Sequence, residues 1–451
     1  MPEQISEMNR VVRVTQASRV ASKIWTEYCA RATIYAQKDK HVAWGMVGIP
    51  TELLLLFDVP VCWPENFGAV AAAHGAAVHF LEIAEADGYA SELCSYLRVG
   101  AGYCKEFMDG GGLIPALSPK GGMPRPTMLL TNSYICDPRI KVFQAYASRF
   151  LHVPIFIQDI PNPPYGTDLS DQRIKKYHVE HYLSELKRLV AFLEEVTGRK
   201  YDESRFREIM VVSQETERLL YEVVELRKIV PCPLPSEDCF TSLVLIWLYM
   251  MGEDQALEFA RQMYAEVKER ANNKVGVIPV EQYRIATMGI PPWYCLGVFN
   301  YMESQGIVGV MDGNYYRGEP LEMDLSEPLH ALAEKIWLRC AEAYRHGDCA
   351  NSPEPASSGP SGTVPAGRYL EWIDSFKLDG VLIFYTRSCR AVSIGQTHAR
   401  RRLMEVGIPS LVLNVDMADP RQWSDLQIKE QINSFRDLME TTKKNGRKYG
   451  S

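Results

Sequence analysis

The chain has 451 residues, of which 46% are hydrophobic and 23% are charged, and this composition is ordinary for a globular protein with about two or three domains. The formal net charge of −7 offers no positive field to a phosphate backbone, so nucleic acid is not expected as a partner. The longest apolar run, at 242–252, is shorter than the roughly 20 residues of a membrane span, and the polar first residues do not resemble a signal peptide. We therefore expect a cytoplasmic protein that does not bind a membrane.

In chain order, the sequence divides into four stretches. Residues 1–40 have helical spacing with few breakers and predict an N-terminal helical segment. Residues 41–168 alternate short apolar runs with helix signals, which predicts a first α/β lobe. Residues 169–270 contain long, charged, amphipathic stretches and predict a helical middle segment. The alternation resumes over 271–451, which predicts a second α/β lobe.

Alternation of strands and helices is typical of parallel sheets covered by helices. We therefore predict an α/β fold with two Rossmann-like lobes that contain parallel sheets and are joined by the helical middle segment. Residues 349–372 depart from this pattern, because they are rich in Pro, Gly, Ser and Ala and lack periodicity. They predict a surface loop, which is either a flexible linker or a flap over a site near Cys389.

Common catalytic motifs are missing from the sequence. It contains no G-x-x-x-x-G-K-[ST] loop and no dinucleotide fingerprint between a strand and a helix, so we expect this chain to bind no nucleotide. It also lacks a G-x-S-x-G elbow and an H-E-x-x-H pair. His178 and His181 lie on a charged helical stretch and are predicted to be solvated. The absence of C-x-x-C disfavours zinc ribbons and redox dithiols.

The sequence has eleven cysteines, and structural disulfides are rare in a reducing cytosol. Most of them are therefore predicted to be small buried hydrophobic residues. Cys136 and Cys389 differ, because each follows a predicted strand and precedes a predicted helix, and Cys94 lies at or near a helix that follows an apolar segment. In open α/β sheets, the ends of distant strands meet at the ligand-binding edge. Thiolates are also favoured at helix N-termini, which lower the pKa of a thiol.

Three thiolates that converge between two lobes would form a soft site, suited to iron and sulfide rather than to magnesium or calcium. Spacing alone leaves an alternative open, in which the cysteines are structural and the protein binds a small molecule without redox chemistry. The pattern indicates a cluster site only if the tertiary structure brings the three residues together.

Five segments of the chain are similar to a known family: VGIPTELLLLFDVPVCWPEN, ELCSYLRVG, LLTNSYIC, SCRAVSIGQ and GIPSLVLNVDMADPRQWSDLQIKEQINSF. Over nearly the whole chain, the sequence resembles the 2-hydroxyacyl-CoA dehydratase and benzoyl-CoA reductase family. The SCRAVSIGQ segment is most similar to the B-type subunit of ATP-dependent benzoyl-CoA reductase. The resemblance implies a 4Fe-4S cluster bound by Cys94, Cys136 and Cys389. Cys62 lies where a fourth iron ligand could come from, whereas Cys104 is not expected to bind iron.

The resemblance implies an enzyme and an assembly. The implied activity is that of the iron-sulfur subunit of an ATP-dependent benzoyl-CoA reductase, an oxidoreductase that reduces the aromatic ring of an aroyl-CoA by single electrons to a cyclohexadienoyl-CoA. The implied partners are a homologous cluster-bearing subunit, ATP-hydrolysing electron-activator subunits and reduced ferredoxin as the upstream donor. A first alternative is a subunit of a 2-hydroxyacyl-CoA dehydratase, which eliminates water through a ketyl radical. A second alternative is an electron-relay subunit that binds no substrate itself.

Arginines near Cys389 are candidate substrate contacts. Arg387 and Arg390 could bind the phosphates of CoA, because guanidinium groups bind phosphate bidentately. The run of three arginines at 400–402 is more typical of a solvated helix face.

The implied catalytic position is the fourth iron, which three cysteine ligands leave open. Ser388 and Ser393 could hydrogen-bond the cluster sulfurs, and Ser393 is a candidate catalytic residue, although both serines could equally cap a helix. Trp293, Tyr294 and Phe384 could line an apolar pocket for a ring, whereas aromatic residues at such spacing mostly belong to a core.

Overall fold

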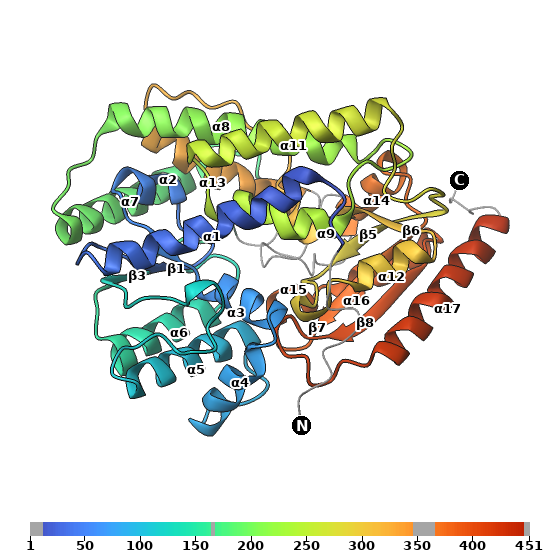
Figure 1. Cartoon of the computed structure of the whole chain (residues 1–451). Helices are drawn as coiled ribbons and strands as arrows, with labels where there is room; N and C mark the ends of the chain where they lie inside the picture. The colour runs from blue at the N-terminus through green and yellow to red at the C-terminus, as the bar shows by residue number, and fades with distance from the viewer. Residues whose placement is uncertain (1–11, 164–166, 346–365, 446–451) are drawn as a thin grey trace.

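Two four-stranded sheets, in which all neighbouring strands are parallel, form the framework of the protein (Figure 1). The computed structural model describes residues 12–163, 167–345 and 366–445. The first sheet has the order β2-β1-β3-β4 and the second has the order β6-β5-β7-β8, so both halves repeat one topology. The predicted α/β fold with two parallel sheets is confirmed. The strands are β1 (Ala43–Gly45), β2 (Val61–Cys62), β3 (Met128–Asn132), β4 (Ile155–Gln158), β5 (Tyr283–Met288), β6 (Ile307–Asp312), β7 (Gly380–Thr386) and β8 (Ser410–Val415).

Helices connect the strands, because neighbouring parallel strands require a crossover. In the first half these helices are α2 (Thr51–Leu56), α3 (Pro64–Ala73), α4 (Ala77–Ala86), α5 (Ser95–Asp109), η2 (Pro119–Gly121), α6 (Pro138–Ala145) and η3 (Tyr146–Leu151). In the second half they are η5 (Trp293–Cys295), α12 (Val298–Ser304), η6 (Gly313–Tyr315), α13 (Pro328–Arg345), α14 (Ala366–Ser375), α15 (Arg390–Ser393) and α16 (Gln396–Glu405), and α17 (Asp425–Lys444) follows the last strand.

The N-terminal helix and a group of middle helices complete the fold (Figure 1). The N-terminal helix α1 (Gln16–Ala36) packs on α11, and α11 packs on α8. Helix α8 contacts α2 in the first half and α13 in the second half, so the middle helices connect the two halves. The predicted N-terminal helix and helical middle segment are confirmed. The middle helices are α7 (Gln172–Thr197), α8 (Glu203–Leu226), α9 (Ser236–Asp238), η4 (Cys239–Leu243), α10 (Val244–Tyr249) and α11 (Asp254–Asn272).

The strands are apolar along most of their length because each sheet is covered on both faces. In β3, Met128 and Leu130 pack into one core cluster, whereas Leu129 packs into a second cluster. In β7, Val381 joins the first cluster and Leu382 joins the second. Successive side chains of a strand point to opposite faces, so each cluster draws residues from both sheets.

The predicted surface loop over 349–372 is wrong in its last part. Residues 349–365 lie outside the described residues, and the linker and flap alternatives lie there with them. The chain from Ala366 forms helix α14, on which Tyr369 and Trp372 are buried. The Tyr369 hydroxyl donates a hydrogen bond to the Thr287 carbonyl oxygen at 2.9 Å. These two aromatic residues have helical spacing, which the Pro- and Gly-rich composition before them concealed.

The prediction that His178 is solvated is also wrong. Its ring is buried against Trp337 of α13, with the ring centroids 5.1 Å apart, and it lies 3.3 Å from the Tyr182 hydroxyl. His181 is half-buried, 3.4 Å from the Asp159 carboxylate. The charged residues of α7 lie on its outer face, and the sequence did not reveal that α13 covers the other face.

No helix within the described ranges is long and apolar enough to cross a bilayer. The division of the chain into domains at about residues 40, 168 and 270 stays a prediction.

Replacement of Arg227 should destabilise the second half of the chain. Its buried guanidinium donates hydrogen bonds to the Asp312 carboxylate at 2.7 Å and to the Gly309 carbonyl oxygen at 3.1 Å. Arg227→Met leaves a buried carboxylate without its partner, so we expect the free energy of unfolding to fall by about 3–5 kcal/mol in urea titrations. The matched control is Arg205→Met, because Arg205 pairs with Glu208 on the surface and such pairs contribute less than about 1 kcal/mol. Equal effects of the two substitutions would contradict this account.

Candidate functional site

Three cysteines lie where strands end and helices begin. Cys136 follows β3 and precedes α6, Cys389 follows β7 and precedes α15, and Cys94 immediately precedes α5. All three are half-buried, free cysteines. Cys62 and Cys104, in contrast, are buried in the core. The three candidates therefore retain partial access to a ligand, which a thiol within the core does not.

Two contacts join the segments that contain the three cysteines. The backbone N–H of Ser95, next to Cys94, donates a hydrogen bond to the Ser388 hydroxyl, next to Cys389, at 3.2 Å. The Arg390 guanidinium, on the other side of Cys389, lies 3.2 Å from the carboxylate of Asp137. Asp137 follows Cys136 directly. The structure therefore brings the three segments to one place between the two sheets.

The pKa values of the thiols reflect burial and mutual proximity. Burial raises the pKa of Cys94 well above its usual value, and the neighbouring Cys389 and Cys136 raise it further. Burial raises the pKa of Cys136. It also raises the pKa of Cys389 to about 12, with a further contribution from Cys136. Thiols that influence one another electrostatically lie close together, which independently supports a shared site.

The predicted lowering of the thiol pKa at helix N-termini is present but outweighed. A backbone N–H three residues further on lowers each pKa, namely that of Leu97, Arg139 or Val392. Burial disfavours the charged thiolate more strongly. The net shift is therefore upward in the protein without a bound cation, and the thiols are protonated at neutral pH.

The donor set fits an iron-sulfur cluster. Within the described ranges, no three His, Cys, Asp or Glu side chains converge on the position of a single metal ion. A 4Fe-4S cluster is larger than one ion and binds each cysteine through a different iron. Thiols that share a site without meeting at one point suit such a group. The assignment of Cys94, Cys136 and Cys389 as its ligands stays a prediction.

The sequence analysis missed a buried ion pair beside the cysteines. The Glu65 carboxylate raises the pKa of all three thiols, so it lies near each of them. The Arg139 guanidinium lies 3.2 Å from this carboxylate and donates a hydrogen bond to the Val47 carbonyl oxygen at 2.7 Å. An acidic residue directly after Pro64 at a helix start was the available signal for Glu65. The burial of Arg139 has no such signal.

The predicted arginine contacts lie at the surface. Arg387 is exposed, and Arg390 is exposed and paired with Asp137. In the run at 400–402, Arg401 and Arg402 pair with Glu405 on the outer side of α16, as expected for a solvated face.

The serine hydroxyls near Cys389 donate to oxygen atoms of the protein. Ser393 donates to the Thr386 carbonyl oxygen at 2.7 Å, and Ser388 donates to the Asp416 carboxylate. Ser388 in addition accepts the Ser95 N–H described above. These serines therefore fix the loop after β7 rather than cap a helix. Their protons are not directed at a thiol in this structure.

The aromatic candidates divide between core and site. Phe384 and Tyr294 are buried in the core. Trp293 is half-buried, and its indole N–H donates a hydrogen bond to the hydroxyl of Tyr96, close to Cys94 in sequence.

A cavity of about 170 Å³ opens at the carboxyl ends of strands from both sheets. In the first half it is lined by residues 48–52 after β1, by Tyr134 after β3 and by Ile160 after β4. In the second half it is lined by Arg317 beyond β6 and by residues of α13. Ligands of doubly wound folds bind at this edge. Tyr134 also connects the cavity to the cysteines, because its carbonyl oxygen accepts the Cys136 N–H at 3.1 Å.

Three cations and two carboxylates line this cavity. Glu217 forms ion pairs with Lys335 at 3.0 Å and with Arg339 at 2.6 Å. The Glu52 carboxylate accepts a hydrogen bond from the Ser213 hydroxyl at 2.6 Å. The remaining cation is Arg317.

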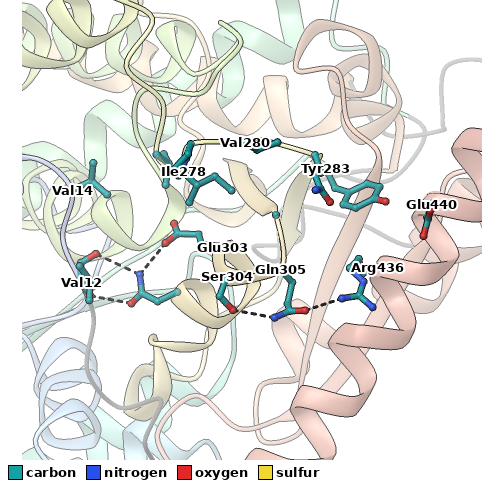
Figure 2. Close-up of a pocket in the computed structure, with 15 residues that line it drawn as sticks. Val12, Val14, Ile278, Val280, Tyr283, Glu303, Ser304, Gln305, Arg436 and Glu440 are labelled. Carbon is teal, nitrogen blue, oxygen red and sulfur yellow. Dashed lines mark hydrogen bonds between the residues drawn. The ribbon is translucent and has the colours of Figure 1, made fainter.

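A larger open groove of about 910 Å³ lies elsewhere (Figure 2). It includes Tyr283 at the start of β5 and residues 304–306 before β6, so it is at the amino ends of these strands. Figure 2 shows Glu303, Gln305 and Arg436 along its wall. The cysteines are at the opposite, carboxyl ends of the strands, and this groove is therefore separate from the candidate site.

Comparison with known proteins places the chain among enzymes that act on CoA thioesters. The profile of the family described as 2-hydroxyglutaryl-CoA dehydratase, D-component, matches residues 46–439. The alpha subunit of (R)-2-hydroxyisocaproyl-CoA dehydratase from Clostridioides difficile is 28% identical over 95% of this chain and 97% of its own length. The alpha subunit of (R)-phenyllactyl-CoA dehydratase from Clostridium sporogenes is 26% identical over 96% and 98%. The B-type subunit of benzoyl-CoA reductase from Thauera aromatica is 24% identical over 89% and 89%.

These values favour the dehydratase subunits over the reductase subunit. The predicted special similarity to the B-type reductase subunit rested on one short segment around Cys389, and it is not supported by identity over the whole chain. The predicted similarity to the wider family is confirmed.

The ion pairs of Glu217 predict an acid-dependent loss of stability. Burial alone would raise the pKa of Glu217, but Lys335 and Arg339 outweigh burial and lower it to about 2. A folded-state pKa below the unfolded value near 4.3 stabilises the fold at higher pH, and about 3 kcal/mol is lost as the pH falls from about 4.5 towards 2. Glu217→Gln should therefore be less stable than the unmodified protein at pH 6, with a difference that narrows towards pH 3 in urea titrations. Glu208→Gln, on the surface, should show almost no difference at either pH. A constant difference for Glu217→Gln would contradict the assignment.

Proposed function

Because the chain belongs to the 2-hydroxyglutaryl-CoA dehydratase D-component family, we propose that it is the cluster-bearing subunit of a 2-hydroxyacyl-CoA dehydratase. The observation on which the proposal rests is the convergence of three half-buried thiols at the carboxyl ends of two parallel sheets. The choice of dehydratase over reductase rests on the higher identity and coverage of the dehydratase alpha subunits.

In this proposal Cys94, Cys136 and Cys389 bind a 4Fe-4S cluster. The bound cluster supplies one-electron chemistry to the thioester of an acyl-CoA. The protein binds the cluster through thiols that must lose their protons, so iron affinity should rise with pH. The Ser95–Ser388 hydrogen bond fixes the distance between two of the three segments. Arg139 offsets the negative charge of Glu65, which would otherwise oppose three thiolates.

The proposal includes partners. The relatives are named as single subunits of larger enzymes, which supports a heteromeric assembly for this chain. We propose a homologous cluster-bearing subunit and an ATP-hydrolysing electron activator as partners, with reduced ferredoxin as the upstream donor. The exposed guanidinium groups of Arg387 and Arg390 are candidates for contact with the phosphates of CoA.

The second candidate is the iron-sulfur subunit of a benzoyl-CoA reductase. It is favoured by the 24% identity with the B-type reductase subunit. An electron-relay role without substrate is the third candidate, and the cavity beside Tyr134 makes it the weakest of the three.

Replacement of a ligand cysteine should abolish the cluster. Cys94→Ser, Cys136→Ser and Cys389→Ser should each lose most of the iron, because three thiolates are the minimum that holds the cluster in this site. Cys104→Ser is the matched control, since Cys104 is buried away from the site, and it should keep about four irons per chain. Iron analysis and the visible absorption of anaerobically purified protein measure the result. Full iron content in all three site variants would contradict the ligand assignment.

Substrate choice should distinguish dehydratase from reductase. The assembled complex, supplied with ATP and a low-potential reductant, should convert a 2-hydroxyacyl-CoA to the enoyl-CoA with release of water. Benzoyl-CoA should remain unchanged, because the proposed reaction requires a hydroxyl group next to the thioester carbonyl. Separation of the thioesters by chromatography measures both reactions. Formation of a cyclohexadienoyl-CoA would overturn the choice in favour of the reductase.

A further inference from the structure

Arg317 lines the cavity between the two sheets, and no described residue pairs with its guanidinium. Within the described residues this group makes no hydrogen bond or ion pair, whereas Lys335 and Arg339 in the same cavity are both paired with Glu217. Burial lowers the pKa of Arg317, and the neighbouring Arg339 lowers it further. A partly buried cation without a partner is costly to the fold. It is most simply explained by an anion that binds there.

Tyr134 supplies a second polar group to the same cavity. Its hydroxyl makes no hydrogen bond to the described residues, and it interacts electrostatically with Arg317. A guanidinium and a phenol hydroxyl are both donors towards an anion. A carboxylate has two acceptor oxygens, so it can accept a hydrogen bond from each of these groups.

The remaining wall of the cavity is apolar. It includes Ile49, Ile160, Trp247, Leu332 and Ile336. The volume of about 170 Å³ is below the roughly 300–1,000 Å³ of pockets that enclose a whole drug-sized ligand. The cavity therefore suits a short aliphatic chain with an anionic end and is too small for a complete CoA molecule.

The position of the cavity relates it to the proposed chemistry. Tyr134 is two residues before Cys136 in the sequence and lies at the same carboxyl edge. A short acyl chain that enters the cavity would place its thioester towards the cysteines and its far end towards Arg317. This step rests on the proposed function, because it takes the ligand to be an acyl-CoA.

We propose that Arg317 and Tyr134 bind a carboxylate at the end of the acyl chain, so that the substrate is a dicarboxylic acyl thioester. Selectivity for this class arises because an uncharged chain leaves the guanidinium desolvated and without a partner. A phosphate of CoA is the other possible source of an anion, and the volume of the cavity disfavours it.

The test compares two thioesters of equal chain length that cannot react, glutaryl-CoA and pentanoyl-CoA. Both lack the 2-hydroxyl group, so calorimetry on the anaerobically purified full-length protein measures binding alone. Glutaryl-CoA should bind about ten- to a hundredfold more tightly, as expected for a charge-assisted contact. Arg317→Met should remove this preference and leave the affinity for pentanoyl-CoA within about twofold. Tyr134→Phe should reduce the preference in part.

Arg205→Met is the matched control, because it removes a guanidinium from the surface of α8 and should keep the preference. Equal binding of the two thioesters by the unmodified protein would overturn the proposal, and this comparison holds even if Arg317→Met fails to fold. A preference that survives in Arg317→Met would overturn it too. If the substitution weakens glutaryl-CoA, pentanoyl-CoA and free CoA alike, Arg317 contacts CoA and the acyl assignment is wrong. If no thioester binds the unmodified protein, the proposed function fails together with this inference.

Discussion

The parallel direction of the strands is the constraint on which the rest of the structure depends. Because every strand in a sheet runs the same way, all carboxyl ends lie at one edge, and the loops that follow them share one space. In this chain the edges of two such sheets face a common region, where residues after β1, β3, β4, β6 and β7 meet. The three cysteines and the cavity both lie there. An antiparallel arrangement would have distributed the same residues over opposite edges.

The environment of the cysteines combines opposing electrostatic effects. Burial and mutual repulsion favour neutral thiols, whereas the N–H groups of the following helices favour thiolates. In the protein alone burial dominates. A bound cationic cluster would reverse this balance, since its charge stabilises thiolates directly. The same site therefore holds neutral thiols without a cluster and becomes a strong ligand set with one.

The cavity shows how two similar cations take different roles. Arg339 is paired with Glu217 and helps to connect α13 with α8. Arg317, from the loop beyond β6, lies beside it, and no carboxylate of the described residues pairs with it. The difference lies in the position of a single acidic side chain. One guanidinium therefore stabilises the fold, and the other remains available to a ligand.

The sequence by itself determined the repeated strand and helix pattern, the helical middle and the positions of Cys136 and Cys389 after strands, because these features depend on local periodicity. The helix at 366–375 was missed because composition masked its spacing, and the burial of His178 was missed because α13 covers α7 from a distant part of the chain. Only the tertiary structure decided that Ser95 contacts Ser388, that Glu65 lies near all three thiols and that Arg317 lacks a partner among the described residues. The physical reason is that charge pairing and burial depend on which segments meet in space, and a local sequence pattern does not contain that information.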